Sequence, residues 1–310
     1  MALRTQTEGN AGESGDDLFD EAFQKKLEYL ALVSRRVFSG RNRAERRSMR
    51  SGAGVEFADY RQYAPGDDYR YVDWGAYQRI GKLLLRLNEE EVDLPVYLLI
   101  DCSRSMGVRG EGALTKLDFA KKLAAALGYV GLAQLDRVSL VALQDTNISH
   151  MPAARGRHRI FKLFEFLRRL GAEGPTDLAT AMGKFTAQHK RRGVAIVLSD
   201  LFDEAGFEEG LNKLRFARFE THVIQIVDPM DAQPSMLGDV ELVDAETGER
   251  RSVTITPAVA RRYANAYAEY LARVERFCRD KQLTHFALAT TTTPEDAVLE
   301  LLRHGGVIAK

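Results

Sequence analysis

The chain has 310 residues, enough for one large α/β domain with appendages or for two smaller domains. Its 44 Lys and Arg residues balance 44 Asp and Glu residues, so overall charge gives no reason to expect nucleic acid or an anionic membrane as partner. The two cysteines lie far apart, which excludes a disulfide scaffold and a paired zinc or redox motif and predicts a reducing, cytoplasmic setting. No apolar stretch is long enough to span a bilayer, and the first residues do not form a secretion signal.

The first 50 residues fall into three stretches. Residues 1–15 are rich in Gly, Ser, Glu and Asp without apolar periodicity, which predicts a disordered tail. From residue 16 to 50 we expect an amphipathic helix, with apolar residues at helical spacing from Leu18 to about Phe38, and then a basic linker. The arginines of this linker are interpreted as solvated surface charges: Arg41, Arg43, Arg46, Arg47 and Arg50.

Residues 51–94 are predicted to form a separate small module with β-strands. Residues 55–63 alternate like a strand, residues 64–68 form a turn, and residues 83–87 resume extended character. Trp74, the only tryptophan, is expected to be a packing anchor. Six charged side chains could form either a docking surface or an internal ion-pair network that holds the small sheet against the main domain, and we favour the network because so small a module needs polar ties: Arg61, Asp67, Asp68, Arg70, Asp73 and Arg79.

From residue 95 to the C-terminus, short apolar strands alternate with amphipathic helices. The predicted strands are residues 96–100, 138–143, 194–198, 223–227 and 285–289. The predicted helices are residues 116–135, 160–167, 178–188, 257–274 and 294–302, and a hairpin is expected between residues 241 and 255. Parallel strands joined by helices with right-handed crossovers give a doubly wound, mostly parallel sheet flanked by helices.

Polar side chains gather where these strands end. Asp101, Ser103 and Ser105 follow the first strand, and Asp200 ends a later one. Open α/β sheets bind ligands at the carboxyl ends of their strands, and carboxylate and hydroxyl oxygens suit a hard divalent cation. The alternative is that both serines cap a turn while Asp101 binds backbone amides. We favour a metal site because the strand-then-acid pattern recurs, with Thr176 between the two acids in sequence.

Other candidate groups do not join this site. Asp228 also ends a strand but has no hydroxyl loop after it. Cys102 should point to the apolar side of its extended segment, as a buried and inert thiol. The histidines lack the spacing of zinc ligands, no Ser-His-Asp triad can be argued, and the glycines of residues 75–82 are wrongly spaced for a phosphate loop. The chain is therefore expected not to be an enzyme.

Two families are similar to these motifs. Three segments in chain order resemble the metal-ion-dependent adhesion site of von Willebrand factor A domains, from about residue 95 to the C-terminus: Asp101-Cys102-Ser103-Arg104-Ser105, Pro175-Thr176-Asp177 and Leu198-Ser199-Asp200. The module before them resembles the signature of the bacterial domain-of-unknown-function 58 family, through Tyr60-Arg61-Gln62-Tyr63-Ala64-Pro65-Gly66-Asp67-Asp68-Tyr69-Arg70-Tyr71-Val72-Asp73-Trp74 with Arg79, Gly81 and Leu83 behind.

The resemblance implies a von Willebrand factor A-like fold and a ligand set. Ser103 and Ser105 would bind the ion, expected to be Mg²⁺, through their hydroxyls, and Thr176 directly or through water. Asp101 and Asp200 would act mostly through water, and one coordination position would stay open for a partner's carboxylate. Arg104 departs from the small residue expected in this loop; it could pair with Asp177, with Asp203 or with an acid of the partner.

The resemblance also implies a role. Members of the second family commonly occur beside MoxR-type AAA+ ATPases, which implies a non-enzymatic adaptor or chaperone-type protein that binds such an ATPase and its substrate. One alternative is a Mg²⁺-dependent hydrolase, such as a phosphatase, with Asp101 as nucleophile. Another is a nucleic-acid binder that uses the basic segment of residues 41–50, which the balanced overall charge makes the weakest of the three.

Overall fold

The computed structural model describes residues 18–38, 56–89, 95–110, 114–144, 148–175, 177–232, 238–243 and 249–304. The chain divides into two compact units. The first contains the described residues up to Arg35 and those from Pro95 onward, and the second contains residues 36–93. The predicted tail of residues 1–15, the basic segment of residues 41–50 and Thr176 lie outside the described residues.

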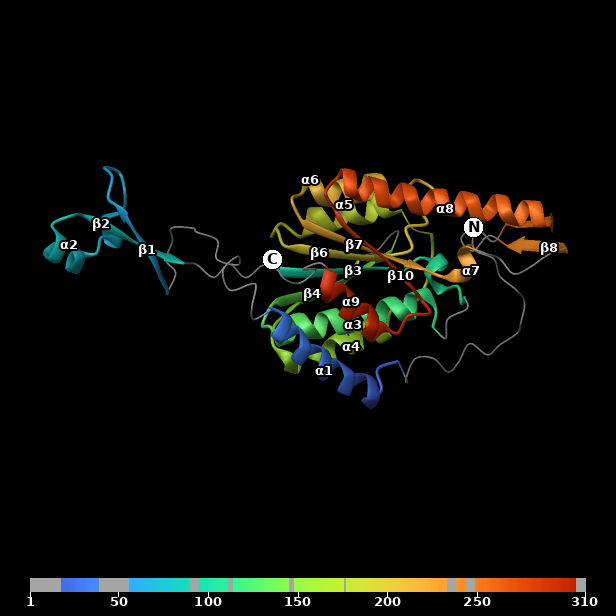
Figure 1. Ribbon diagram of the computed structural model, residues 1–310, viewed down its shortest axis with the longest axis horizontal. Helices are drawn as coiled ribbons and strands as arrows, with labels where there is room; N and C mark the ends of the chain where they lie inside the picture. The colour runs from blue at the N-terminus through green and yellow to red at the C-terminus, as the bar shows by residue number, and fades with distance from the viewer. Residues whose placement is uncertain are drawn as a thin grey trace. The chain divides into compact units, whose positions relative to one another are not determined.

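The first unit is built on a central sheet (Figure 1). Six strands of its described part lie in the order β10-β7-β6-β3-β4-β5, and all are parallel except β5, which runs antiparallel to β4 at one edge. Their bounds are β3 Pro95–Asp101, β4 Arg137–Leu143, β5 Ser149–Ala154, β6 Val194–Ser199, β7 Glu220–Val227 and β10 Thr284–Ala289. The predicted doubly wound, mostly parallel sheet is confirmed.

Helices cover both faces of this sheet (Figure 1). One face carries α5 Leu178–Gln188, α6 Glu208–Phe216 and α8 Pro257–Asp280, and the other carries α3 Lys116–Ala133, α4 Ile160–Arg168 and α9 Pro294–His304. Between the sheet and the first helix layer lies a core of fully buried side chains that includes Leu99, Val197, Phe185 and Leu211. This packing fixes the strand ends, where the candidate site lies.

Helix α3 ends two residues earlier than the sequence pattern predicts. The Asp136 N–H donates to the Gly131 carbonyl at 3.0 Å and the Leu135 N–H donates to the Leu132 carbonyl at 3.2 Å, which is the hydrogen-bond pattern of a Schellman cap. Leu135 occupies the left-handed position of that cap, with φ of 67°, and its side chain is 54% exposed. Its predicted place on the buried face of the helix is wrong.

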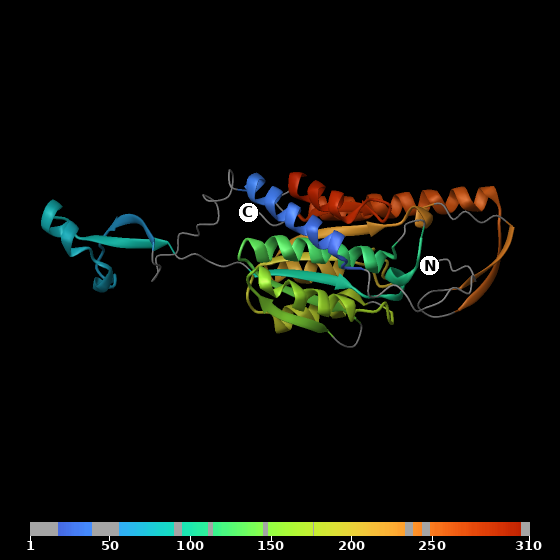
Figure 2. The ribbon, with the colours of Figure 1, turned by 90° about the horizontal axis from the view of Figure 1, so that it is seen from below.

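The first unit, with its sheet between two layers of helices, is called the sandwich below. The predicted N-terminal helix is α1, Glu21–Phe38, which belongs to this unit up to Arg35. Its first turn is capped by Asp20, whose Oδ1 accepts the Phe23 N–H at 2.6 Å. Phe19, just before the helix, stacks on Phe164 of α4 at 4.6 Å between ring centroids, and Lys26 pairs with Glu295 of α9 at 3.1 Å. Figure 2 shows α1 lying across the layer that α3 and α9 form.

A hairpin and two helices follow the sheet strand β7. The short helix α7, Pro229–Ala232, comes first, and the antiparallel strands β8 Gly238–Val243 and β9 Arg250–Ile255 form the hairpin that the sequence predicts. Thr256 caps α8 by accepting the Val259 N–H, and Pro257 is its first residue. Among the described helices, none has the length and apolar content needed to cross a membrane.

The second unit contains a two-stranded antiparallel sheet, β1 Glu56–Gln62 with β2 Leu84–Glu89, and the helix α2, Trp74–Ile80. Both strands agree with the sequence prediction, and α2 was not predicted. Trp74 is 57% exposed and contacts Tyr77 edge to face at 6.3 Å. Within this unit it is not the predicted packing anchor, because α2 buries Ala76 instead and leaves its aromatic side chains outside.

Polar ties within the module join its turn, strands and helix. Arg61 pairs with Asp67 at 2.8 Å, and Arg70 pairs with Asp68 at 2.7 Å. Asp73 accepts a hydrogen bond from the Tyr60 hydroxyl at 2.6 Å, and through its other oxygen it caps α2. These contacts form a polar network within the module, whereas the predicted tie of the module to the main domain stays a prediction.

Candidate metal centre

Two neighbouring strands bring Asp101 and Ser199 together. β3 and β6 run parallel with Ile100 opposite Leu198, so Asp101 and Ser199 follow at the same edge of the sheet. The Ser199 hydroxyl donates to Asp101 Oδ2 at 2.5 Å and accepts the Leu201 N–H at 2.8 Å. Ser199 thus fixes one oxygen of Asp101 from the neighbouring strand, a role that the sequence analysis missed.

The loop after β3 places two serine hydroxyls beside Asp101. The Ser103 N–H donates to Asp101 Oδ1 at 2.9 Å, and the Ser103 and Ser105 hydroxyl oxygens lie 2.9 Å apart in a hydrogen bond. Both serines are buried. Ser103 precedes the short turn Arg104–Gly107, but its hydroxyl caps no backbone N–H there. The capping alternative therefore fails for Ser103, whereas Asp101 does bind a backbone amide as that alternative expects.

The loop that carries Thr176 is tied to both of its neighbours. The Glu173 N–H donates to the Cys102 carbonyl at 2.9 Å, and the Arg104 N–H donates to the Gly174 carbonyl at 3.1 Å. On the other side, Asp203 Oδ2 accepts the Leu178 N–H at 2.8 Å. These bonds hold the segments that flank Thr176 between the Asp101 loop and the loop after β6.

A buried lysine that the sequence analysis did not single out contacts the remaining predicted ligand. The Lys116 ammonium lies 2.8 Å from Asp200 Oδ2 and 3.0 Å from Asp231 Oδ2, and the lysine side chain is 1% exposed. The other oxygen of Asp200 accepts the Phe202 N–H at 3.2 Å. Lys116 is the first residue of α3, where a positive charge is unfavourable because it lies at the positive end of the helix dipole. This unfavourable placement is the sequence feature that could have singled out Lys116.

Burial and mutual repulsion set the charge state of these groups. Burial and the charge of Asp200 raise the pKa of Asp101 to about 6. Burial by itself would lower the pKa of Lys116, but Asp200 and Asp231 outweigh it, so the pKa is raised and the ammonium stays protonated. The edge of the sheet therefore holds acids whose ionisation a nearby cation would favour.

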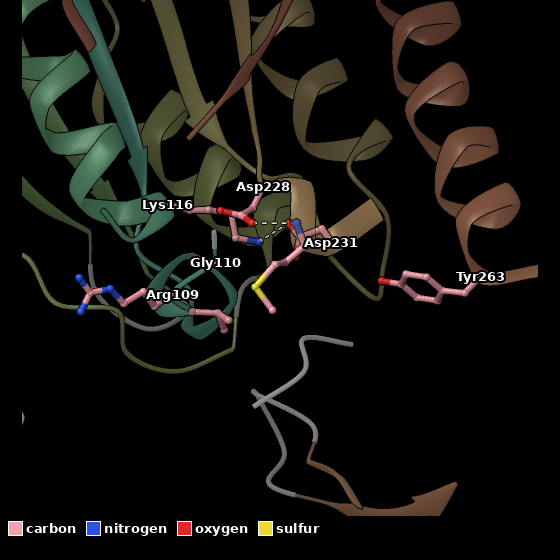
Figure 3. A pocket seen from close by; sticks show the side chains of 8 residues that line it. Arg109, Gly110, Lys116, Asp228, Asp231 and Tyr263 are labelled. Atoms are coloured by element: carbon pink, nitrogen blue, oxygen red, sulfur yellow. Dashed lines mark hydrogen bonds and ion pairs between the residues drawn. The ribbon is translucent and has the colours of Figure 1, made fainter. Parts of the chain in front are cut away.

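A small pocket lies beside this ion pair, and Figure 3 shows Lys116 and Asp231 facing each other in it. Its volume is about 20 Å³, which is room for about one water molecule. Asp228 lines it and is tied by the Thr290 hydroxyl at 2.5 Å and the Met230 N–H at 2.9 Å. A Cβ at Gly110 would overlap the Asp228 carboxyl group, so the Gly110 backbone lies directly against that side chain.

Cys102 is fully buried, as predicted. Its Sγ faces the Ile100 carbonyl oxygen at 3.6 Å, and burial raises the pKa of the thiol, which keeps it protonated. The cysteine between the site residues is therefore a packed, inert side chain.

The donor set fits a hard divalent cation. The oxygens of Asp101, Ser103 and Ser105 converge at one loop, and Asp200 follows the adjacent strand. Among the described residues, no three Asp, Glu, His or Cys side chains gather in a way that could hold a metal. A metal ion at this edge would therefore need the serine hydroxyls among its ligands, and the metal site stays a prediction.

Comparison with solved structures finds distant neighbours. BatB from Bacteroides thetaiotaomicron, described as a conserved hypothetical protein, has a TM-score of 0.43 and 14% identity, over 68% of this chain and 96% of that one. The von Willebrand A domain of SpRpn10 has a TM-score of 0.36 and 12% identity, over 67% and 94% of the two chains. The doubly wound, mostly parallel sheet flanked by helices is the fold class that the sequence analysis predicts.

Sequence comparison gives the family. An uncharacterized protein of Mycobacterium tuberculosis is 29% identical over 266 residues, which cover 85% of this chain and 83% of that protein. A second uncharacterized protein, from Mycobacterium avium, is 31% identical over 161 residues, covering 50% and 92% of the two chains. The family model described as "Protein of unknown function DUF58" matches residues 59–273, a span that includes both the signature module and the site. The chain therefore belongs to the DUF58 family.

Proposed function

We propose that this protein is a non-enzymatic interaction protein that binds an acidic side chain of a partner through a divalent cation at the carboxyl edge of its sheet. The observation that carries the proposal is the pair of buried serine hydroxyls, 2.9 Å apart, beside Asp101. Buried hydroxyls of this kind usually bind backbone groups, but here they contact each other next to a buried carboxylate. Two hydroxyl oxygens beside a carboxylate are suited to bind an ion that prefers oxygen ligands.

The chain's own groups would hold the ion. Ser103 and Ser105 would be direct ligands, Thr176 a direct or water-mediated one, and Asp101 and Asp200 would supply negative charge mainly through water. When bound, Mg²⁺ supplies a Lewis-acidic position that a partner's carboxylate can occupy. Asp101 is kept in orientation by the Ser199 hydroxyl and the Ser103 N–H, one on each oxygen.

Binding is favoured over hydrolysis by the surroundings of Asp101. Both oxygens of its carboxylate already accept hydrogen bonds from the chain, which makes it a poor nucleophile. A Mg²⁺-dependent hydrolase with Asp101 as nucleophile stays the second candidate, and incubation with Mg²⁺ and a generic phosphate ester tests it: turnover that disappears in Asp101→Asn would favour it.

The proposed partner is a MoxR-type AAA+ ATPase together with the substrate of that ATPase, acting in the cytoplasm. This part of the proposal rests on the family resemblance and not on a contact in the structure. In it the ATPase supplies the energy, and the present chain supplies recognition. No nucleic-acid partner is proposed, because the chain has equal numbers of basic and acidic residues.

Ion binding is tested by thermal unfolding and by calorimetric titration with Mg²⁺, each with a chelator control. Mg²⁺ should raise the Tm of the wild type because it binds only the folded state. The double variant Ser103→Ala/Ser105→Ala should lose this shift. Ser139→Ala is the matched control, since Ser139 is a buried serine of β4 whose hydroxyl binds the Met151 carbonyl, outside the site. A wild-type Tm that is the same in Mg²⁺ and in chelator would contradict the proposal.

Partner capture is tested by co-purification in Mg²⁺ and in chelator, followed by identification of the recovered proteins. The wild type should recover a MoxR-type ATPase in Mg²⁺ alone, and Ser103→Ala/Ser105→Ala should recover it in neither condition. Recovery of the same proteins in both conditions by both chains would remove the metal from the mechanism.

A further inference from the structure

Lys116 joins three elements at the carboxyl edge of the sheet. It begins α3, Asp200 follows β6, and Asp231 lies in α7, so its ammonium bridges two carboxylates that are otherwise unconnected in the chain. The ammonium also lies 5.0 Å from the centre of the Phe202 ring. Figure 3 shows the lysine reaching from the start of α3 toward Asp231.

This buried position is energetically unfavourable for a lysine. Its side chain is 1% exposed, and removing an ammonium from water costs several kcal/mol unless nearby charges offset it. The helix dipole at the first residue of α3 adds to that cost. Packing alone does not account for the residue, since an apolar side chain of similar length would fill the same space without the penalty. The charge of Lys116 is the feature that needs a role.

We propose that Lys116 is a resident cation that sets the divalent-ion affinity of the site, an inference that rests on the function proposed above. Its ammonium already compensates Asp200, a residue that would also supply charge to the ion. An incoming ion therefore meets less net negative charge than Asp101, Asp200 and Asp231 together carry. The ion is held weakly by the chain itself and firmly once the partner's carboxylate adds its charge.

The ion pair offers two opposite ways to change this charge. Lys116→Met removes the positive charge and keeps the length of the side chain, so the ion should bind more tightly. Asp231→Asn removes a negative charge from the far side of the ammonium and keeps an oxygen for it, so the ion should bind more weakly. A merely structural role for Lys116 predicts that both substitutions weaken ion binding, because both would disturb Asp200.

The experiment is a titration of the full chain with Mn²⁺, followed by electron paramagnetic resonance of the free ion and by calorimetry at constant ionic strength. The Kd for Mn²⁺ should fall about tenfold in Lys116→Met and rise severalfold in Asp231→Asn. Lys122→Met is the matched control, because Lys122 is on the same helix and its ammonium lies over the Phe23 ring of α1, on the other side of α3 from the site. Its Kd should equal that of the wild type.

Each outcome decides something different. If the wild type binds Mn²⁺ and a folded Lys116→Met binds it equally or more weakly, the inference about Lys116 is overturned and the proposed function stands. If only Lys116→Met binds Mn²⁺, the lysine takes the place of the ion in the wild type; the inference holds and the metal-dependent function fails. If no variant binds, both fail. Should Lys116→Met not fold, Lys116→Gln replaces it because it also removes the positive charge, and equal or weaker Mn²⁺ binding by a folded Lys116→Gln overturns the inference.

Discussion

The two units of the chain are stabilised in different ways. In the sandwich, β3 is buried at every position, and the strand end that carries Asp101 is surrounded by packed strands and helices. In the module, the described side chains that are buried are Val72, Ala76 and Leu85, and the ties between elements are exposed hydrogen bonds and ion pairs. The site is therefore positioned by apolar burial, whereas the family signature is held in shape by polar contacts at the surface.

The largest expected effect comes from a matched pair of core truncations. Leu99→Ala removes a fully buried side chain from the central strand and should lower the free energy of unfolding of the sandwich by about 2–5 kcal/mol. Leu85→Ala in the module should leave the unfolding of the sandwich unchanged. Urea denaturation followed by circular dichroism measures both. Equal destabilisation of the sandwich by the two variants would show that the units unfold as one.

A pH series should separate the buried acid from the exposed ones. Because the pKa of Asp101 is raised to about 6 in the folded protein, its burial costs nothing below about pH 4, and stability is lost as the pH rises through 6. In chelator, the free energy of unfolding of Asp101→Asn relative to that of the wild type should increase by up to about 3 kcal/mol between pH 4 and pH 7.5. Urea unfolding at each pH measures the difference, and a gap that does not vary with pH would contradict it.

The same proton should compete with the ion. Asp101 must be ionised to contribute charge, so the affinity for Mg²⁺ should fall as the pH is lowered through about 6. Calorimetric titration of the wild type at pH 7.5 and pH 5 measures this loss. Affinity that is the same at both values would mean that Asp101 carries no part of the binding.

In the module, substitution of Asp73 should lower local stability the most. Asp73→Ala removes the acceptor of the Tyr60 hydroxyl and the cap of α2 in one step. Hydrogen exchange at Ala76 should become faster, while exchange in β3 and β6 stays as in the wild type. If exchange in the sheet also changed, the module would be contributing to the stability of the sandwich.

The smallest effect is expected at the exposed ion pairs. Arg70→Ala removes the partner of Asp68, in a pair whose two side chains are 75% and 34% exposed. Pairs of this kind contribute little because water already solvates both charges. The Tm of this variant should be the same as that of the wild type, and a clear decrease would indicate that the signature network acts as one unit.

The strands of the sandwich were predictable because strands buried on both faces form uninterrupted apolar runs. β5 was not, because it is an edge strand in which Met151 is the buried residue and no apolar run marks it. Helix α2 was missed because it buries Ala76 and so has no apolar face to recognise. In each missed element, the local sequence carries too little apolar periodicity to compete with an interpretation as a loop.

The candidate site likewise has contacts that could be predicted from the sequence and contacts that could not. The approach of Asp101 and the strand end before Asp200 follows from topology, because neighbouring parallel strands end at one edge. The contacts of Lys116 with Asp200 and Asp231 span 84 and 115 residues, and no local pattern announces such pairs. Within the module Trp74 is exposed and not buried, because residue type predicts burial only on average.

That exposed tryptophan has a practical consequence. Trp74 is the only tryptophan of the chain and belongs to the module, so intrinsic tryptophan fluorescence reports on the module alone. The far-ultraviolet dichroism of the helices reports mainly on the sandwich, whereas tyrosines occur in both units. The wild-type chain therefore carries a built-in optical probe of its signature segment, and a shift in the tryptophan emission on adding a partner would show, without any label, that this segment takes part in the complex.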